Sequence, residues 1–210
     1  MMRSHNSDTF RVLPAPNNSR TQQLRNIGKD TLGAGNFRQQ VKLPDGADKY
    51  DWIALNTVEF YNQCVLLYTP ISKYCTDHRC PEMTAGPQYQ YFWQEDRRYK
   101  PITLPAHTYI EKVFEWAGRY ISNSHYFPED EKSTYANDFE IVIRNIFKKL
   151  LRVYAHIYYH HSDDMRQDDL LASLNTSFRH FWTFSDEFKL IPDDQLAPLQ
   201  TIIKSFEIKS

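Results

Sequence analysis

The feature that most constrains the fold is the periodic pattern of residues 138–161, where apolar side chains recur every three or four positions. This spacing predicts a long α-helix with one face in the core, because such positions share a side of a helix. The predicted core face consists of Ile143, Phe147, Leu150, Tyr154 and Ile157, with Ile146 and Val153 beside them. Arg144, Lys148 and Arg152 recur every four residues on the opposite side, which predicts a basic stripe facing solvent.

The rest of the chain is predicted to be mainly helical, with one small β-element. Asp48 is a plausible N-cap for the first long helix. Residues 88–93 alternate polar and aromatic side chains, and residues 99–104 follow after a charged turn, so we predict a β-hairpin there, with Pro101 favouring an edge strand. Further helices are predicted at about 48–67, 106–122, 165–187 and 193–206.

Turn-forming residues divide the chain into two parts. Prolines, asparagines and glycines cluster before residue 36, which predicts a flexible segment over residues 1–35. One helical domain is predicted over residues 36–210, a length that one core can serve. The predicted fold class is therefore all-α: an antiparallel helical bundle with a small appended β-hairpin.

Charge and composition argue against several classes of function. The chain has 25 Lys and Arg against 26 Asp and Glu, which argues against a nucleic-acid binder that works through bulk positive charge. No run approaches the roughly 18 apolar residues of a membrane span, and the first residues lack the apolar segment of a secretory signal. Three cysteines, an odd number, fit a reducing compartment better than a disulfide framework. We therefore expect an intracellular protein.

Two pairs of residues have the spacing of zinc ligands. Cys75 and Cys80 have four residues between them, and His156, His160 and His161 crowd the end of the long predicted helix. Two thiolates and two imidazoles match the closed tetrahedral shell of structural zinc. On an ideal helix His156 and His160 point the same way, about 40° apart, whereas His161 lies about 140° from His156. Ideal geometry thus favours His160, although a distorted last turn would bring in His161 instead.

These cysteines and histidines have other interpretations. The cysteines are alternatively buried apolar residues, with the histidines on the surface; Cys64, among Val65 and Leu66, is predicted to be core. A zinc hydrolase is disfavoured, because catalytic zinc keeps a position open for water and four protein ligands close the shell. The chain also has no HExxH, GxSxG or P-loop motif.

Six segments, in order, resemble the Mob (Mps-one-binder) family, and the resemblance extends from about residue 31 to residue 206. They are 31–36 (TLGAGN), 51–60 (DWIALNTVEF), 75–87 (CTDHRCPEMTAGP), 152–158 (RVYAHIY), 174–181 (LNTSFRHF) and 196–199 (LAPL). The resemblance implies a four-helix-bundle core with peripheral helices, no enzymatic activity, and structural zinc held by Cys75, Cys80, His156 and His161. Here the family spacing selects His161, against the preference of an ideal helix. The intact cysteines place the chain nearer the kinase co-activators than the phocein-type scaffolds, which are the alternative.

The resemblance also implies a kinase-binding face on the first long helix. Asp51, Leu55 and Glu59 recur every four residues, with Trp52 alongside and Asp48 just before, so acidic groups flank an apolar anchor. Family members resemble co-activators of NDR/LATS-type AGC kinases, whose basic N-terminal regulatory region would bind here. This chain has Ala47 where the family often has another acid, a departure that bears on affinity and partner choice. The alternative is that Trp52 is core and the acids are only solvated.

A second surface and two modification sites complete these expectations. In relatives, the positions of Lys148, Lys149 and Arg152 resemble a phosphopeptide pocket that recruits an upstream Hippo-type kinase or phosphorylated scaffold, since Arg and Lys suit a phosphate. Thr9 and Thr31 resemble regulatory phosphorylation sites, of which Thr31 is the better match. The resemblance implies roles in mitotic exit, cytokinesis or Hippo-like signalling, in the cytoplasm, with the nucleus and the spindle poles or division site as further locations.

Overall fold

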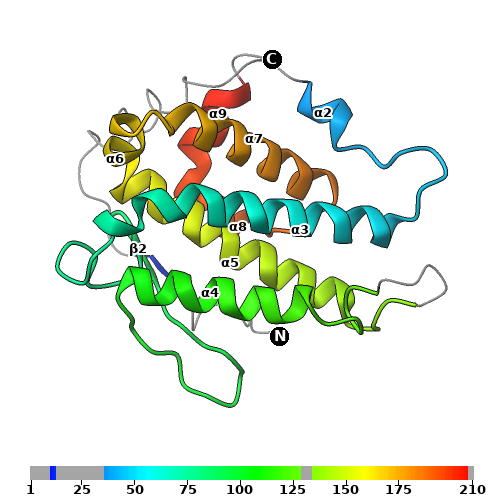
Figure 1. Ribbon diagram of the computed structural model, residues 1–210, viewed down its shortest axis with the longest axis horizontal. Coiled ribbons are helices and arrows are strands. Elements are labelled where there is room, and N and C mark those ends of the chain that lie inside the picture. The colour runs from blue at the N-terminus through cyan, green and yellow to red at the C-terminus, as the bar shows by residue number, and fades with distance from the viewer. Residues whose placement is uncertain (1–9, 13–35, 129–133, 208–210) are drawn as a thin grey trace.

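The computed structural model describes residues 10–12, 36–128 and 134–207, and in these the chain is mostly helical (Figure 1). The longer helices are α3 (Lys49–Tyr68), α4 (Ala106–Ile121), α5 (Phe139–His160) and α7 (Leu171–Glu187). The shorter ones are α2 (Phe37–Gln40), the 3-10 helix η1 (Thr69–Tyr74), α6 (Ser162–Gln167), α8 (Asp193–Leu196), the 3-10 helix η2 (Ala197–Leu199) and α9 (Gln200–Glu207). Within these ranges, no helix is both long enough and apolar enough to cross a membrane.

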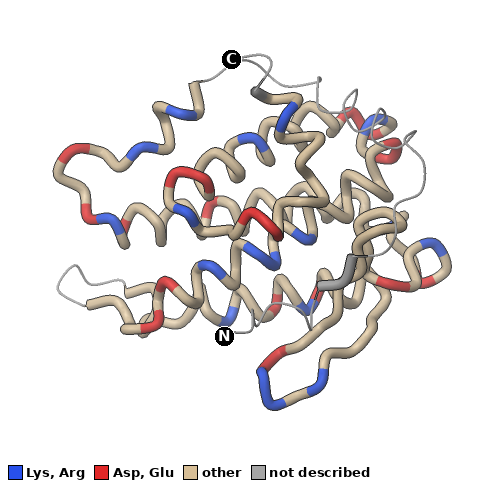
Figure 2. Tube along the Cα trace, turned by 180° about the vertical axis from the view of Figure 1, so that it is seen from behind, with Lys and Arg blue, Asp and Glu red and all other residues tan. Residues whose placement is uncertain are grey.

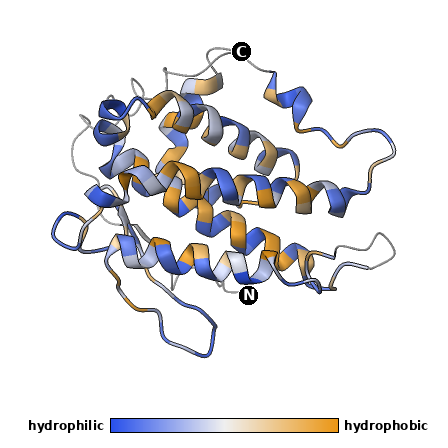
Figure 3. Cartoon of the chain, in the orientation of Figure 1, coloured by the Kyte–Doolittle hydropathy of each residue, from blue (hydrophilic) through white to orange (hydrophobic). Residues whose placement is uncertain are grey.

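Figure 1 shows α3 and α5 running in one direction, with α4 and α7 running the opposite way. Helix α5 lies between the others, and Figure 3 shows apolar residues gathered along it and on the helix faces around it. All five residues of the predicted core face, Ile143 to Ile157, have no exposed surface, which confirms that face. Phe147 stacks on Phe181 of α7 at 5.0 Å between ring centroids, and Phe60 of α3 meets Phe181 edge-on at 5.5 Å. These rings join three helices in one aromatic core.

Local chemistry explains where several helices begin and end. The Asp48 carboxylate accepts hydrogen bonds from the backbone N–H groups of Tyr50 and Asp51, as the N-cap prediction required. The single helix predicted at 165–187 is wrong: α6 and α7 are separate, and Asp169 between them has a φ of 57°. The helix predicted at 193–206 is likewise divided, because Pro198 has no N–H to continue a helix.

The predicted hairpin is confirmed at one pair of residues, but the main pairing of its first strand is different. Strand β3 (Tyr89–Tyr91) is the middle strand of a three-stranded antiparallel sheet, between β1 (Phe10–Val12) and β2 (Thr84–Ala85). The predicted partner, residues 99–104, contributes only an isolated bridge between Trp93 and Ile102. The turn from β2 to β3 uses Gly86 at a φ of 66°, where a Cβ atom would lie 2.5 Å from the Tyr159 ring. Only glycine fits there, so this turn fixes β2 as the partner.

Candidate metal centre and binding faces

Four buried side chains from two distant parts of the chain form one cluster. Cys75 follows η1 and Cys80 lies in the next turn, whereas His156 is in the last turns of α5 and His161 lies between α5 and α6. The ligand atoms of all four lie within 4.8 Å of one another, so the group could hold a metal ion. The cluster therefore ties the chain after α3 to the end of α5.

The structure decides between the two candidate histidines in favour of His161. Helix α5 ends at His160, and His161 leaves helical geometry with φ −130° and ψ 13°, which turns its ring toward the cysteines. The Nε2 atom of His160 instead accepts a hydrogen bond from the Gly86 N–H at 3.2 Å and lies 2.9 Å from the Thr84 hydroxyl. The ideal-helix preference for His160 is thus wrong, because the helix ends one residue before the ligand.

The distances fit a tetrahedral metal. Cys75 Sγ lies 3.5 Å from His156 Nε2, and Cys80 Sγ lies 3.6 Å from His161 Nε2. Zinc–sulfur and zinc–nitrogen bonds of about 2.3 and 2.05 Å at the tetrahedral angle place sulfur and nitrogen about 3.5 to 3.6 Å apart. The donor set and these two distances are therefore compatible with zinc.

Hydrogen bonds outside the cluster fix both imidazole rings. His156 Nδ1 lies 2.8 Å from the Thr84 carbonyl oxygen, and His161 Nδ1 lies 2.8 Å from Asp164 Oδ2. Since these oxygens only accept, each Nδ1 donates and each Nε2 presents its lone pair to the thiols. Asp164 is held in turn by Arg79, with Nη1 to Oδ2 at 2.8 Å. Sequence reasoning missed these supporting groups; the spacing of three residues between His161 and Asp164 was a signal for one of them.

The pKa values of the Cys75 and Cys80 thiols are shifted in opposite directions. A hydrogen bond from the Cys75 thiol lowers the pKa of Cys80, and the nearby imidazoles of His156 and His161 act in the same direction. The same hydrogen bond, together with burial, raises the pKa of Cys75. A metal takes cysteine as thiolate, so its binding would release the remaining proton of this pair.

Comparison with known proteins assigns the chain to a family. Residues 29–199 match the family model described as Mob1/phocein. The chain belongs to the Mob1/phocein family. It is 43% identical over 202 residues to "MOB kinase activator-like 1A" of Arabidopsis thaliana, covering 95% of this chain and 94% of that protein. It is 40% identical over 198 residues to "Maintenance of ploidy protein mob1" of Schizosaccharomyces pombe, covering 94% of each. It is also 40% identical to "MOB kinase activator-like 1 homolog C" of Dictyostelium discoideum, over 83% of this chain and 82% of that protein.

In this Mob1/phocein chain the predicted kinase-binding residues lie at the start and along one side of α3. Asp51, Leu55 and Glu59 are exposed, Leu55 to 64%. Trp52 is half-buried against the core, and its indole N–H donates to the Val41 carbonyl oxygen at 3.1 Å. Trp52 therefore lies beside the exposed row, with its side chain packed against the core and not projecting into solvent.

Two features of this face were not foreseen. Leu66, 72% exposed, extends the row along α3 toward η1, with exposed Asn62 between it and Glu59. The Tyr135 hydroxyl donates to Asp51 Oδ1 at 2.7 Å, so the residues before α5 border the acidic end of the face. Leu55 and Leu66 are two of the few large apolar residues exposed in the described part of the chain.

The predicted basic stripe on α5 is largely covered. Arg144 is exposed, Lys148 is half-buried, and Arg152 is only 5% exposed, so the prediction of a solvent-facing stripe is wrong for Arg152. Arg152 Nη1 donates to the Tyr109 hydroxyl at 2.8 Å, and its guanidinium lies 5.1 Å from the Tyr91 ring centroid. Arg152 is therefore covered by Tyr109 of α4 and Tyr91 of β3.

Lys149 lies beside this stripe, among aromatic rings. Its Nζ atom is 4.2 Å from the Trp93 ring centroid and 5.2 Å from that of Trp116. Burial, with Arg152 and Lys148 nearby, lowers the pKa of Lys149 to about 7. The candidate phosphorylation sites Thr9 and Thr31 lie outside the described residues, and Cys64 is buried as predicted, with its pKa raised by that burial.

Proposed function

We propose that this protein is a non-catalytic adaptor and co-activator of protein kinases of the NDR/LATS type. Family membership supports this function, and so do the relatives named MOB kinase activator-like 1A and MOB kinase activator-like 1 homolog C. The exposed row on α3 is the structural observation that carries the proposal. An acidic row containing leucines suits an amphipathic partner segment that carries Arg and Lys, such as the N-terminal regulatory region of such a kinase.

The cluster of two cysteines and two histidines serves, in this proposal, as a structural zinc site. Zinc bound there would supply a cross-link between the chain after α3 and the end of α5. Because four protein atoms complete a tetrahedral shell, the residues leave no coordination position for a reacting water, which supports a non-catalytic role. We take α3, α4, α5 and α7 as the four-helix core that this cross-link braces.

The kinase-binding function is tested by charge reversal on the exposed row. We expect Asp51→Lys with Glu59→Lys to reduce capture of an NDR/LATS-type kinase N-terminal region by at least about tenfold, because like charges then face each other. A matched control is Glu111→Lys with Glu187→Lys, two exposed acids on α4 and α7. Unchanged capture by the first variant, with an unchanged unfolding curve, would rule out this face.

The cluster Lys148, Lys149 and Arg152 is proposed to bind phosphopeptides of an upstream Hippo-type kinase or phosphorylated scaffold. Three cationic side chains within one turn and a half of α5, with little competing acid, support this assignment. A phosphothreonine peptide should bind the Lys148→Gln variant more weakly than it binds the unaltered protein. For each of these two proteins, the phosphorylated peptide should bind more tightly than the unphosphorylated peptide. Equal affinity of the two peptide forms for the unaltered protein would exclude the phosphate site.

The remaining parts of the proposal follow from the family. Phosphorylation of Thr31, and of Thr9, would add nearly two negative charges each to the segment before α2 and would release it from the kinase-binding face. The proposed setting is mitotic exit, cytokinesis or Hippo-like signalling in the cytoplasm, with the nucleus and the spindle poles or division site as further locations. Replacing both threonines with alanine should abolish any rise in kinase affinity that follows treatment with the upstream kinase.

A further inference from the structure

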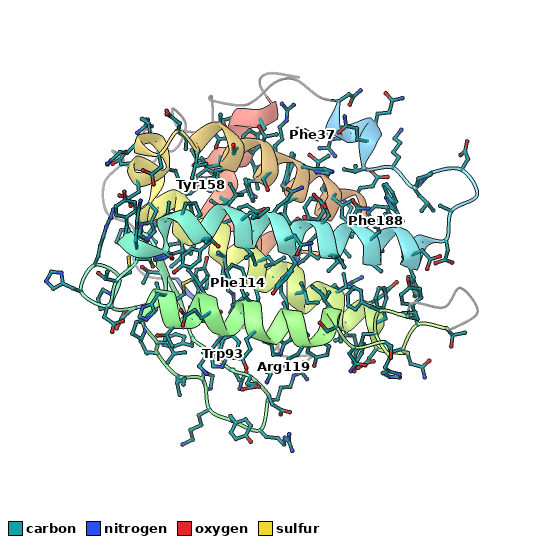
Figure 4. The ribbon with its side chains drawn as sticks, in the orientation of Figure 1. Phe37, Trp93, Phe114, Arg119, Tyr158 and Phe188 are labelled. Atoms are coloured by element: carbon teal, nitrogen blue, oxygen red, sulfur yellow. The ribbon has the colours of Figure 1, made fainter. Side chains whose placement is uncertain are left out.

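A concave site of about 580 Å³ lies between the loop that contains residues 94–99 and the C-terminal half of α4. Figure 4 shows both Trp93 and Arg119 below α4, on the side from which this loop extends. The volume is in the range of small-molecule and peptide side-chain pockets. It belongs neither to the metal cluster nor to the exposed row on α3.

Aromatic rings form the inner wall of this site. Trp116 is only 7% exposed, and its ring lies 4.9 Å from that of Tyr120, which meets Tyr126 edge-on at 5.0 Å. Tyr126 is fixed by a hydrogen bond from its hydroxyl to Asp138 Oδ2 at 3.3 Å. Ring faces of this kind attract cations through their quadrupole.

Carboxylates form the rim. Glu95 pairs with Arg119, and Asp96 pairs with Arg98 through two nitrogen atoms, but both acids remain more than 40% exposed. Arg119 Nη1 also lies 3.9 Å from Glu115. Exposed ion pairs of this kind contribute little free energy, so an incoming cation can replace an arginine beside its acid. Figure 2 shows acidic and basic residues side by side along this loop.

The site borders the proposed phosphate-binding residues. Trp116 lines the cavity and also lies 5.2 Å from Lys149 Nζ, and Glu95 is close enough to Lys149 to raise its pKa against the larger lowering effect of burial. One tryptophan thus separates a cationic cluster from a pocket whose two acids, Glu95 and Asp96, are each paired with an arginine of the same rim. A peptide that crossed both would meet the cationic cluster first and these two exposed ion pairs next.

We propose that this pocket binds an arginine or lysine side chain of the same phosphopeptide, two residues from the phosphorylated one. An extended peptide advances about 7 Å over two residues, which matches a step across a single tryptophan ring. The side chain would lie against Trp116 and Tyr120 with its charge between Glu95 and Asp96. This inference rests on the proposed phosphopeptide binding, and it adds which sequences around the phosphate are selected.

The test uses four peptides, with phosphothreonine or threonine at the centre and arginine or alanine at both second-neighbour positions. The unaltered protein should bind the phosphorylated arginine peptide about tenfold more tightly than the phosphorylated alanine peptide. Glu95→Gln with Asp96→Asn should remove this preference, measured within the variant as the ratio of its affinities for the phosphorylated arginine and alanine peptides. Glu187→Gln with Asp193→Asn, two exposed acids elsewhere, should keep the preference.

The possible results separate the two proposals. Phosphate dependence without an arginine preference, or a preference that survives in the Glu95 and Asp96 variant, overturns the pocket and leaves the phosphate site standing. Binding that ignores the phosphate overturns the phosphate site and the pocket with it. Unfolding curves for both double variants, recorded beside the binding data, show whether each protein tested is folded.

Discussion

Helices α3 and α5 carry two rows of charged residues with the same spacing but opposite surroundings. Asp51 and Glu59 on α3 are exposed, whereas α5 runs from exposed Arg144 to Arg152, which is 5% exposed. The difference arises because α3 has one side on the surface, whereas α5 is covered by α3, by α4 and by the sheet. A four-residue spacing therefore shows which side chains share a face, but not what covers that face.

The candidate metal cluster joins the same two helices. The chain after α3 supplies both cysteines, and the end of α5 supplies both histidines, so one metal would tie together the ends of the two elements compared. An open face on α3 and a covered row on α5 both depend on this junction. The largest effect is therefore expected there, and the other predictions separate the two rows.

Removal of the proposed zinc ion should lower the stability of both helices together. We expect chelation, or Cys80→Ser, to reduce the free energy of unfolding by at least about 4 kcal/mol, the stabilisation given by a ligand present at 1,000 times its dissociation constant. Thermal unfolding followed by circular dichroism, with metal content measured on the same samples, checks this. Cys64→Ala is the matched control, because it alters a buried cysteine outside the cluster and should keep the response to chelator. An unfolding curve indifferent to chelator would show that no metal braces the fold.

The next prediction compares the ends of the row on α5. Arg152→Met should cost about 1 to 3 kcal/mol of stability, because it leaves the buried Tyr109 hydroxyl without the guanidinium that donates to it. Arg144→Met, at the exposed end, should stay within about 0.5 kcal/mol. Urea denaturation of both variants measures the difference. Equal costs would mean that Arg152 is not buried in solution.

Lys149 provides a pH test of the same covered region. Its pKa is lowered to about 7, so between pH 7 and its ordinary value the unfolded chain binds a proton that the folded chain lacks. Stability therefore rises with pH across this window, and the cost of burying the charge is complete below pH 7. The free energy of unfolding of the Lys149→Met variant should be higher than that of the unaltered protein by on the order of 1 kcal/mol at pH 6. The difference should be smaller at pH 9. A difference that does not change with pH would show that Lys149 titrates normally.

The sequence predicted the elements better than the partners of those elements. The period of 138–161 identified both α5 and its core face, because burial of apolar side chains follows directly from helical spacing. The hairpin prediction found the Trp93–Ile102 bridge but missed the main strand pairing. That pairing depends on a distant segment, Phe10–Val12, and on the turn at Gly86, neither of which alternation within residues 88–104 reveals.

The candidate metal site shows the same limit. Cysteine and histidine types at zinc spacing indicated the ligands, but ideal helix geometry selected His160, and only the end of α5 at that residue turns His161 inward. The Thr84 carbonyl fixes His156, and Arg79 holds Asp164, which in turn fixes His161. Arg152 could not be predicted as buried, because nothing within α5 records that Tyr91 and Tyr109 cover it. Helical spacing is local, whereas covering is a property of the whole fold.

The smallest effect on stability is expected on the open face of α3, where binding should change most. Leu55→Gln with Leu66→Gln should alter the free energy of unfolding by less than about 0.5 kcal/mol, because both side chains are mainly in water already. The same variant should reduce affinity for the kinase N-terminal region by about tenfold, since two apolar anchors of the proposed interface are lost. Ile102→Gln, an exposed apolar residue on the loop below α4, is the control for a general loss of surface hydrophobicity and should leave kinase affinity unchanged. Isothermal titration calorimetry with the three proteins measures these affinities.

If both variants bind like the unaltered protein, the exposed leucines do not form the kinase-binding surface. If the α3 variant also unfolds more easily, α3 is covered in solution and its contrast with α5 disappears.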